Sequence, residues 1–254
     1  APRWPVESLP TLNRDREGAM TEMPGVAEQT APAAARWEDL IDIIFSPAAV
    51  FRRRADESWK PTFLLLVGVS VVLYYVLFPV QQIVARAQLT DPAQLQAYEQ
   101  YGRMFSLVGG IIIVPVGIAV VLLATAAWLW ILARLVEVRL AFNRMFLITA
   151  LTALLGPLAQ LVTSAVVFLK RNGDLHPKHD LSIGVLPFLD PAAVPDTLVP
   201  VLARVAVFPI WQAVLWGVGI AIFARATKAQ AAIVAGVAWI TAAAPQVVFA
   251  LLRG

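Results

Sequence analysis

The stretch FSLVGGIIIVPVGIAVVLLATAAWLWILA, residues 105–133, decides the fold class of this chain. Its 29 residues include no Asp, Glu, Lys, Arg or His. An α-helix rises about 1.5 Å per residue, so about 20 apolar residues cross the hydrocarbon core of a bilayer. This stretch exceeds that length, and it therefore predicts a helix that spans a membrane.

Four further uncharged runs follow the same pattern, at residues 61–85, 145–169, 205–224 and 229–252. Each holds at least 20 residues, which is enough for one crossing. We therefore predict an all-α polytopic membrane protein with five transmembrane helices. The predicted membrane domain covers residues 61–254, after a tail at 1–35 and an interfacial segment at 36–60.

The composition of the whole chain agrees with this prediction. Only 15% of the 254 residues are charged and 59% are hydrophobic, whereas a soluble domain usually carries about 25% charged residues. These figures exclude a soluble enzyme, a disordered chain and a disulfide scaffold. The formal net charge of +3 is too small for a nucleic-acid partner. The lack of cysteine excludes thiolate chemistry, cysteine-ligated zinc and iron–sulfur clusters.

The first 35 residues differ in character from the rest of the chain. They hold five prolines and mixed charges, and they lack the apolar run of a signal peptide. We expect an extended, Pro-rich tail on the cytoplasmic side, which is disordered when it stands alone.

Residues 36–46 have the spacing of a short amphipathic helix. Acidic residues at Glu38, Asp39 and Asp42 take the polar face. The segment is too short and too charged to cross a bilayer, so we expect it at the interface or on a partner protein. Its apolar face, the predicted contact with lipid or partner, consists of Trp37, Leu40, Ile41, Ile44 and Phe45.

A second interfacial helix is predicted to follow, with Ser46 as N-cap and Pro47 in the first turn. It carries the basic cluster Arg52, Arg53 and Arg54. Arginines near a membrane surface attract anionic headgroups, each contributing about 1 kcal/mol. We expect all three to contact anionic lipid.

The placement of Lys and Arg predicts the orientation. With a cytoplasmic N-terminus, the inner segments hold 13 of these residues and the outer ones 7. Cytoplasmic loops usually carry this excess, so the C-terminus is expected on the opposite side. The longest outer loop, residues 170–204, is apolar and rich in proline. We expect it to lie on the membrane surface or against a neighbour, with Phe188 as a contact residue.

No catalytic or metal site is predicted. His176 and His179 have an H-x-x-H spacing in the outer loop, but histidines in such a loop are more often solvated than ligating. The uncharged runs contain no ionisable residue, which argues against an ion-coupled transporter. Gln160 and Gln212 could line an uncoupled path, although polar groups in spans more often join helices through hydrogen bonds.

Small residues and tryptophan within the runs predict close helix packing. One proline lies in or near each run, and proline is frequent in ordinary membrane helices. The residues that we expect at helix contacts are Gly109, Gly117, Trp211, Gly217 and Gly219.

The chain resembles the bacterial branch of the Yip family, the Ypt-interacting-protein domain. One part of the resemblance is residues 44–51, IFSPAAVF, followed by arginines and by Trp59-Lys60-Pro61. The other is Phe208-Pro209-Ile210-Trp211, then Gly217-Val218-Gly219, the turn at 225–232 and Trp239. The resemblance covers about residues 37–252 and implies five spans, a cytoplasmic N-terminus and the bacterial inner membrane.

For eukaryotic members, the resemblance implies an association with small GTPases and vesicle traffic. Those members usually carry an acidic Asp-Leu-Tyr-Gly-Pro-like motif before the first span. Here the region reads Asp56-Glu57-Ser58-Trp59-Lys60-Pro61, so GTPase binding is not transferred to this chain.

Three functions are compatible with these features. The first is a non-catalytic scaffold or accessory subunit that bridges other integral membrane proteins, for example in a respiratory or photosynthetic complex. The second is a membrane-shaping or lipid-handling protein with anionic lipids as partners. The third is an uncoupled transporter. We expect no enzyme activity and no cofactor other than lipid.

Overall fold

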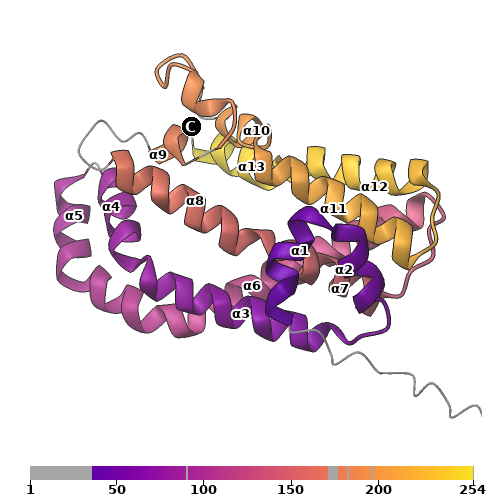
Figure 1. Ribbon diagram of the computed structural model, residues 1–254. Helices are drawn as coiled ribbons and strands as arrows, with labels where there is room; N and C mark the ends of the chain where they lie inside the picture. Colours follow the sequence, from indigo (N-terminus) through magenta and orange to yellow (C-terminus); the bar gives the residue numbers. More distant parts are fainter. Residues whose placement is uncertain (1–35, 90, 171–176, 182, 196, 254) are drawn as a thin grey trace, which may run out of the picture. The chain divides into compact units, whose positions relative to one another are not determined.

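The computed structural model describes residues 36–89, 91–170, 177–181, 183–195 and 197–253 (Figure 1). The predicted tail at 1–35 lies outside these residues. All regular elements described are helices, and the one β-type pairing is an isolated bridge between Gly184 and Ala206. The all-α prediction is confirmed.

Four helical segments of the described chain are long and apolar enough to cross a membrane. They are Trp59–Val76, Ser106–Leu135, Phe142–Lys170 and Lys228–Val248. The remaining predicted run forms α11 (Val207–Phe223), an apolar helix of 17 residues that is shorter than the other four. The structure therefore supports a membrane protein with four candidate spans and one shorter apolar helix.

Three of the predicted runs are interrupted ahead of a proline, the last of them between Thr241 and Ala244, before Pro245. The first divides at Leu77 into α3 (Trp59–Val76) and α4 (Phe78–Gln88), just before Pro79. The third divides at Leu154 into α7 (Phe142–Ala153) and α8 (Leu155–Lys170), just before Pro157. Proline has no N–H to donate to the carbonyl four residues back, so it is tolerated in the first turn of a helix, where Pro79 and Pro157 lie in α4 and α8.

The second run remains one helix in spite of its proline. After α5 (Pro92–Ala97) and a π-helical turn at Tyr98–Gly102, α6 extends over Arg103–Leu135 with Pro115 inside it. At its other end, a turn with Glu137 at a φ of 61° leads to α7.

The C-terminal helices form a hairpin and a short extension. α11 turns through Arg225, at a φ of 50°, into α12 (Lys228–Thr241), and α13 (Ala244–Arg253) follows. Thr227 and Gln230 form a capping box at the start of α12. Gln230 Nε2 also donates to the Val136 carbonyl over 3.1 Å, which joins α12 to the end of α6.

The core centres on α7. Residues 145–152 of this helix are all buried, and α3, α6 and α11 pack around it. Trp216 Nε1 on α11 donates to Thr152 Oγ1 over 3.1 Å inside this core. By contrast, α6 exposes a long series of aliphatic side chains. Such a surface belongs in lipid rather than in water.

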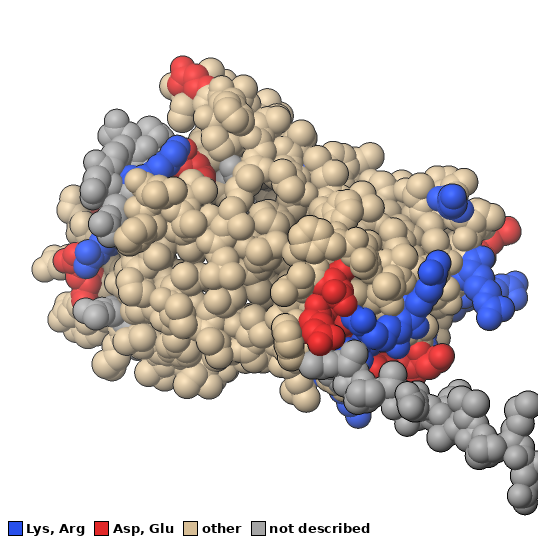
Figure 2. Space-filling view, in the orientation of Figure 1, with Lys and Arg blue, Asp and Glu red and all other residues tan. Residues whose placement is uncertain are grey.

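Charged side chains gather at two ends of the face shown in Figure 2. One end holds α2 (Pro47–Arg54) and the α11–α12 turn, and the other holds α4, α5 and α9 (Pro177–Asp180). The surface between them is uncharged in this view. An apolar belt between two charged rims is the surface pattern expected of a protein that crosses a bilayer.

The outer loop folds partly onto the start of α11. Val207 N donates to the Ile183 carbonyl over 3.1 Å, and Leu186 is fully buried in the short helix Leu186–Phe188. The chain then continues through α10 (Val199–Leu202).

The residues predicted at helix contacts differ in what they touch. A Cβ added at Gly219 would lie 2.9 Å from both Ile148 Cγ2 and Phe51 Cε1, whereas one at Gly217 would be an ordinary 3.7 Å from Ala235. Trp211 is partly buried and packs against the core.

Gly109 and Gly117 do not serve the predicted helix contacts. A Cβ at Gly109 would meet only Ile113 of the same helix, and one at Gly117 would meet nothing within 4 Å. The close contact is made by Gly110, where an added Cβ would overlap the ring of Tyr74 on α3. Adjacent glycines face different directions on a helix, so sequence spacing alone did not identify the one at the interface.

Gly219→Ala is expected to destabilise the protein by about 1–3 kcal/mol, because the new methyl group overpacks the contact with Ile148 and Phe51. Gly117→Ala, the matched control on α6, has open space and should keep or raise stability, by up to about 1 kcal/mol, because alanine favours the helix more than glycine does. Thermal unfolding of the purified proteins in detergent, followed by tryptophan fluorescence, measures both. Equal melting temperatures for the two variants would contradict the packing described for Gly219.

Candidate membrane-interface site

The interfacial segment folds as a helical hairpin. A 3₁₀ turn at Arg36–Glu38 leads into α1 (Asp39–Phe45), and α2 follows after Ser46. Pro47 occupies the first turn of α2, as predicted, because that position needs no N–H donor. Ser46 stands at the N-cap, but its side chain makes no capping hydrogen bond. Figure 1 shows α1 and α2 lying across the direction of α3 and α11.

A buried ion pair joins the two helices of this hairpin. Asp39 and Arg54 are 2% and 1% exposed, and Arg54 Nε lies 2.7 Å from Asp39 Oδ2. Arg53 Nη2 reaches the other oxygen, Asp39 Oδ1, over 2.5 Å and also contacts Asp42 Oδ2 at 2.8 Å. Arg54 Nη1 bonds Glu57 Oε1 at 2.6 Å. Both oxygens of the Asp39 carboxylate are therefore paired with arginine.

The surroundings of these arginines favour their charged forms. Hydrogen bonds to Asp42 and Asp39 raise the pKa of Arg53 above the ordinary arginine value. Burial works against the charge of Arg54, but its bonds to Asp39 and Glu57 outweigh that effect and its pKa is also raised. The guanidinium groups therefore stay charged and hold the hairpin closed.

Two expectations from the sequence are wrong at this site. Asp39, assigned to the solvent face, points inward, and Arg54, assigned to lipid headgroups, is buried on its pair with Asp39. Arg53 is only partly exposed. Arg52 is the member of the cluster that is exposed and has no ion pair within the described residues.

Aromatic and aliphatic side chains fix the hairpin to the membrane domain. Ile43, Val50 and Phe51 are fully buried. The Phe51 ring meets Phe223 of α11 edge to face, with centroids 5.8 Å apart. Arg144 at the start of α7 donates to the carbonyl of Ala55, directly after α2. The hairpin is thus held in one position by packing as well as by charge.

The outer face of α1 remains apolar and exposed. Trp37, Ile41 and Phe45, spaced by four residues, are 59%, 54% and 79% exposed. Leu40 and Ile44, which the sequence placed on the same face, are partly buried against the core. The predicted apolar face therefore has two parts: Leu40 and Ile44 pack on the core, and the other three side chains remain exposed. We call the exposed part the α1 stripe (Trp37, Ile41 and Phe45).

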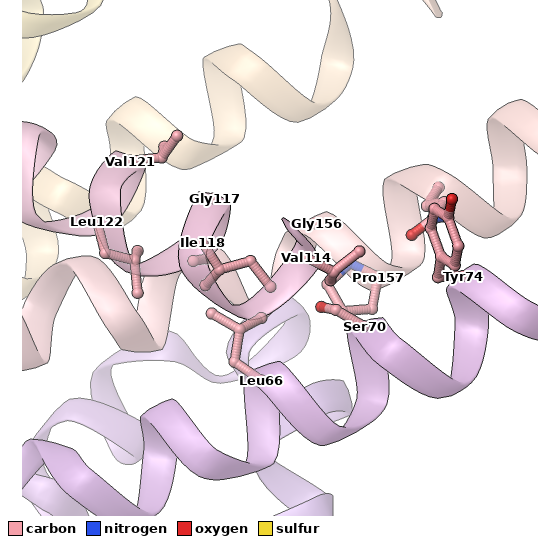
Figure 3. Close-up of a pocket in the computed structure, with 12 residues that line it drawn as sticks. Leu66, Ser70, Tyr74, Val114, Gly117, Ile118, Val121, Leu122, Gly156 and Pro157 are labelled. Carbon is pink, nitrogen blue, oxygen red and sulfur yellow. The ribbon is translucent and has the colours of Figure 1, made fainter. Parts of the chain in front are cut away.

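A cavity of about 390 Å³ lies between α3, α6 and α8 (Figure 3). Its lining includes Ser70, Tyr74 and Gln160 among apolar residues, with Gly156 and Pro157 at the helix break. Gln212 lines a different cavity, of about 460 Å³, on α11. The structure does not place the two glutamines in one cavity.

The outer loop presents Phe188, which is 89% exposed. His179 is buried, contrary to the expectation of a solvated side chain, and its Nδ1 lies 3.3 Å from the Leu186 carbonyl. His176 lies outside the described residues. No group of three or more His, Cys, Asp or Glu that could hold a metal ion occurs in the part of the chain that the structure describes.

The family model of the Yip1 domain matches residues 41–249. This chain belongs to the Yip1 domain family. The match begins inside α1 and ends inside α13, so the hairpin and the apolar helices are both part of the Yip1 domain. The family predicted from the sequence is confirmed, and the bacterial branch stays a prediction. No curated protein and no solved structure matches the chain significantly.

Asp39→Asn is expected to destabilise this Yip1-domain chain by about 3–5 kcal/mol, because it removes the buried carboxylate that both Arg54 Nε and Arg53 Nη2 contact inside the hairpin. Asp42→Asn is the matched control and should cost less than about 1 kcal/mol, since Asp42 is 39% exposed. Thermal unfolding in detergent provides the comparison. The double variant Asp39→Asn/Arg54→Gln should recover part of the loss, and an Asp39→Asn protein as stable as Asp42→Asn would disprove the role of the pair.

Proposed function

We propose that this chain is a non-catalytic integral membrane protein that shapes the bilayer by holding the α1 stripe in one leaflet. The observation that carries the proposal is the docking of α1 through the buried Ile43, with Trp37, Ile41 and Phe45 left exposed. An amphipathic helix with an apolar face and a polar face lies in the plane of the membrane interface. Insertion into one leaflet only would give the two leaflets unequal areas.

The proposed topology has five crossings, made by α3, α6, α7–α8, α11 and α12–α13. The N-terminus is cytoplasmic and the C-terminus lies on the other side of a bacterial inner membrane. Basic residues of the loops support this orientation, because Arg134, Arg139, Arg225 and Lys228 lie in or beside turns on the same side of the helices as α2.

The length of α11 supports the proposed effect on the bilayer. Its 17 residues extend about 26 Å, whereas the hydrocarbon core is about 30 Å thick. A short apolar helix is accommodated by thinning the bilayer around it. α11 is also the helix onto which α2 packs, so the thinned region and the α1 stripe would lie on the same side of the protein.

Phe45→Ser is expected to reduce the effect of the protein on membrane shape, because it removes the most exposed apolar side chain of the stripe. The test reconstitutes purified protein into large liposomes of phosphatidylethanolamine and phosphatidylglycerol, and cryo-electron microscopy measures the vesicle diameters. Wild-type protein should yield smaller or tubulated vesicles, and Phe45→Ser should return them toward protein-free diameters.

Phe188→Ser is the matched control, since it makes the same exchange at an exposed phenylalanine of the outer loop. It should leave the vesicle diameters at the wild-type value. Wild-type vesicles identical to protein-free ones, or equal effects of the two variants, would refute the proposal.

A second candidate function is a scaffold or accessory subunit that bridges other integral membrane proteins. It is favoured by Phe188 at 89% exposure and the neighbouring Leu189 at 39%. Exposed apolar groups outside the lipid-facing helices often mark a protein contact. Co-purification in mild detergent tests it: a stoichiometric partner that is lost with Phe188→Ser and kept with Phe45→Ser would support the scaffold, and purification of the wild type without partner would count against it.

A further inference from the structure

A groove of about 570 Å³ extends between α11 and α12 and is bordered by α2. Small apolar residues form much of its wall, among them Gly217, Ala221, Ala232 and Gly236. A Cβ added at Gly236 would meet nothing within 4 Å, so the space above this glycine is open. These helices belong to the apolar part of the domain, and the groove therefore opens toward lipid.

Two cations border the same groove, Arg52 from α2 and Lys228 from the first turn of α12. Both side chains are exposed, and neither makes an ion pair within the described residues. The nearby carboxylates are already engaged, because Asp39, Asp42 and Glu57 bind Arg53 and Arg54. The positive charge of Arg52 and Lys228 is thus not neutralised by the hairpin.

The charge and the apolar wall together select the type of ligand. A free anion would use the two cations but not the wall, and a neutral lipid would use the wall but not the cations. A lipid with an anionic headgroup uses both, since its phosphate can lie near the basic side chains while an acyl chain follows the apolar groove. We infer that this groove binds one anionic phospholipid, with Arg52 and Lys228 contacting the phosphate and one acyl chain passing over Gly217 and Gly236.

This inference goes beyond the proposed function and does not depend on insertion of the α1 stripe. The groove is formed by α2, α11 and α12, and Trp37, Ile41 and Phe45 are not part of it. If Phe45→Ser does not alter vesicle shape, the proposed function fails and the inference about the groove is unaffected. If the groove binds no lipid, the inference fails and the proposed function is unaffected.

The test is a lipid titration of the purified full-length protein, followed by native mass spectrometry. The main probe is dioleoylphosphatidylglycerol, which has both acyl chains and a net anionic headgroup. Dioleoylphosphatidylcholine has the same chains without the net negative charge, and glycerol phosphate has the anionic group without the chains. One phosphatidylglycerol should bind more tightly than phosphatidylcholine. Arg52→Gln and Lys228→Gln should each weaken its binding about fivefold, the effect expected for the loss of one cation near a membrane surface.

The groove itself is tested with Gly236→Leu, which places a side chain in the open space and should abolish the tight binding of one phosphatidylglycerol. Gly117→Leu is the matched control, because it also has no neighbour within 4 Å of its Cβ and lines the separate cavity between α3, α6 and α8. It should leave phosphatidylglycerol binding unchanged. Melting temperatures of both variants verify that they fold.

Three results would overturn the inference. The first is equal binding of phosphatidylglycerol and phosphatidylcholine in the wild type. The second is binding of glycerol phosphate that Gly236→Leu does not affect, which would reveal a simple anion contact. The third is a dimer of this chain that Gly236→Leu dissociates, which would assign the groove to a second copy.

Discussion

The contact between Asp39 and Arg54 determines where the interfacial helix lies. Removing both charges from water is costly, and the structure offsets that cost by giving the carboxylate two arginine partners and Arg54 a second acid, Glu57. A surface pair would constrain the position of α1 on α2 only weakly. A buried, multiply bonded pair constrains it more strongly, because separating the helices would leave a charge in an apolar environment. The exposed direction of Trp37, Ile41 and Phe45 follows from this constraint.

Apolar packing holds the hairpin on α11, while ion pairs hold its two helices together. Phe51 packs against Gly219 and Phe223 of α11, and a side chain at position 219 would force Phe51 or Ile148 to shift. Arg144 fixes the far end of α2 by donating to the Ala55 carbonyl. With α2 held on α11 in this way, Arg52 lies at the border of the α11–α12 groove. Its neighbours Arg53 and Arg54 form ion pairs with acidic residues of the hairpin. Three consecutive arginines therefore have three different environments.

The sequence predicted the parts of this fold that depend on local composition. Long apolar runs identified the membrane helices, and Pro47 identified the start of α2, because each signal lies within the segment that it describes. The inward position of Asp39 could not be predicted, since its partner Arg54 is 15 residues away and meets it only when the hairpin closes. The choice of Gly110 over Gly109 depends on the rotation of α6 against Tyr74, which spacing does not reveal. The breaks at Leu77 and Leu154 had a visible signal in Pro79 and Pro157, yet Pro115 lies inside an unbroken helix, so proline alone does not decide where a membrane helix ends.

The two rims of the domain are built by different means, and this difference bears on function. Near α9 and α10, Lys170 pairs with the buried Asp180, and Arg204 donates to the carbonyl of Ala242, where α12 has just ended. These cations serve the fold itself. At the end that holds α2 and the α11–α12 turn, Arg52, Arg139, Arg225 and Lys228 are exposed and have no ion pair in the described segments. Anionic headgroups would find exposed cations at this end, where the α1 stripe and the open groove also lie. Exposed cations and exposed apolar surface thus occur together at this end of the domain, which is the combination that the proposed contact with anionic lipid requires.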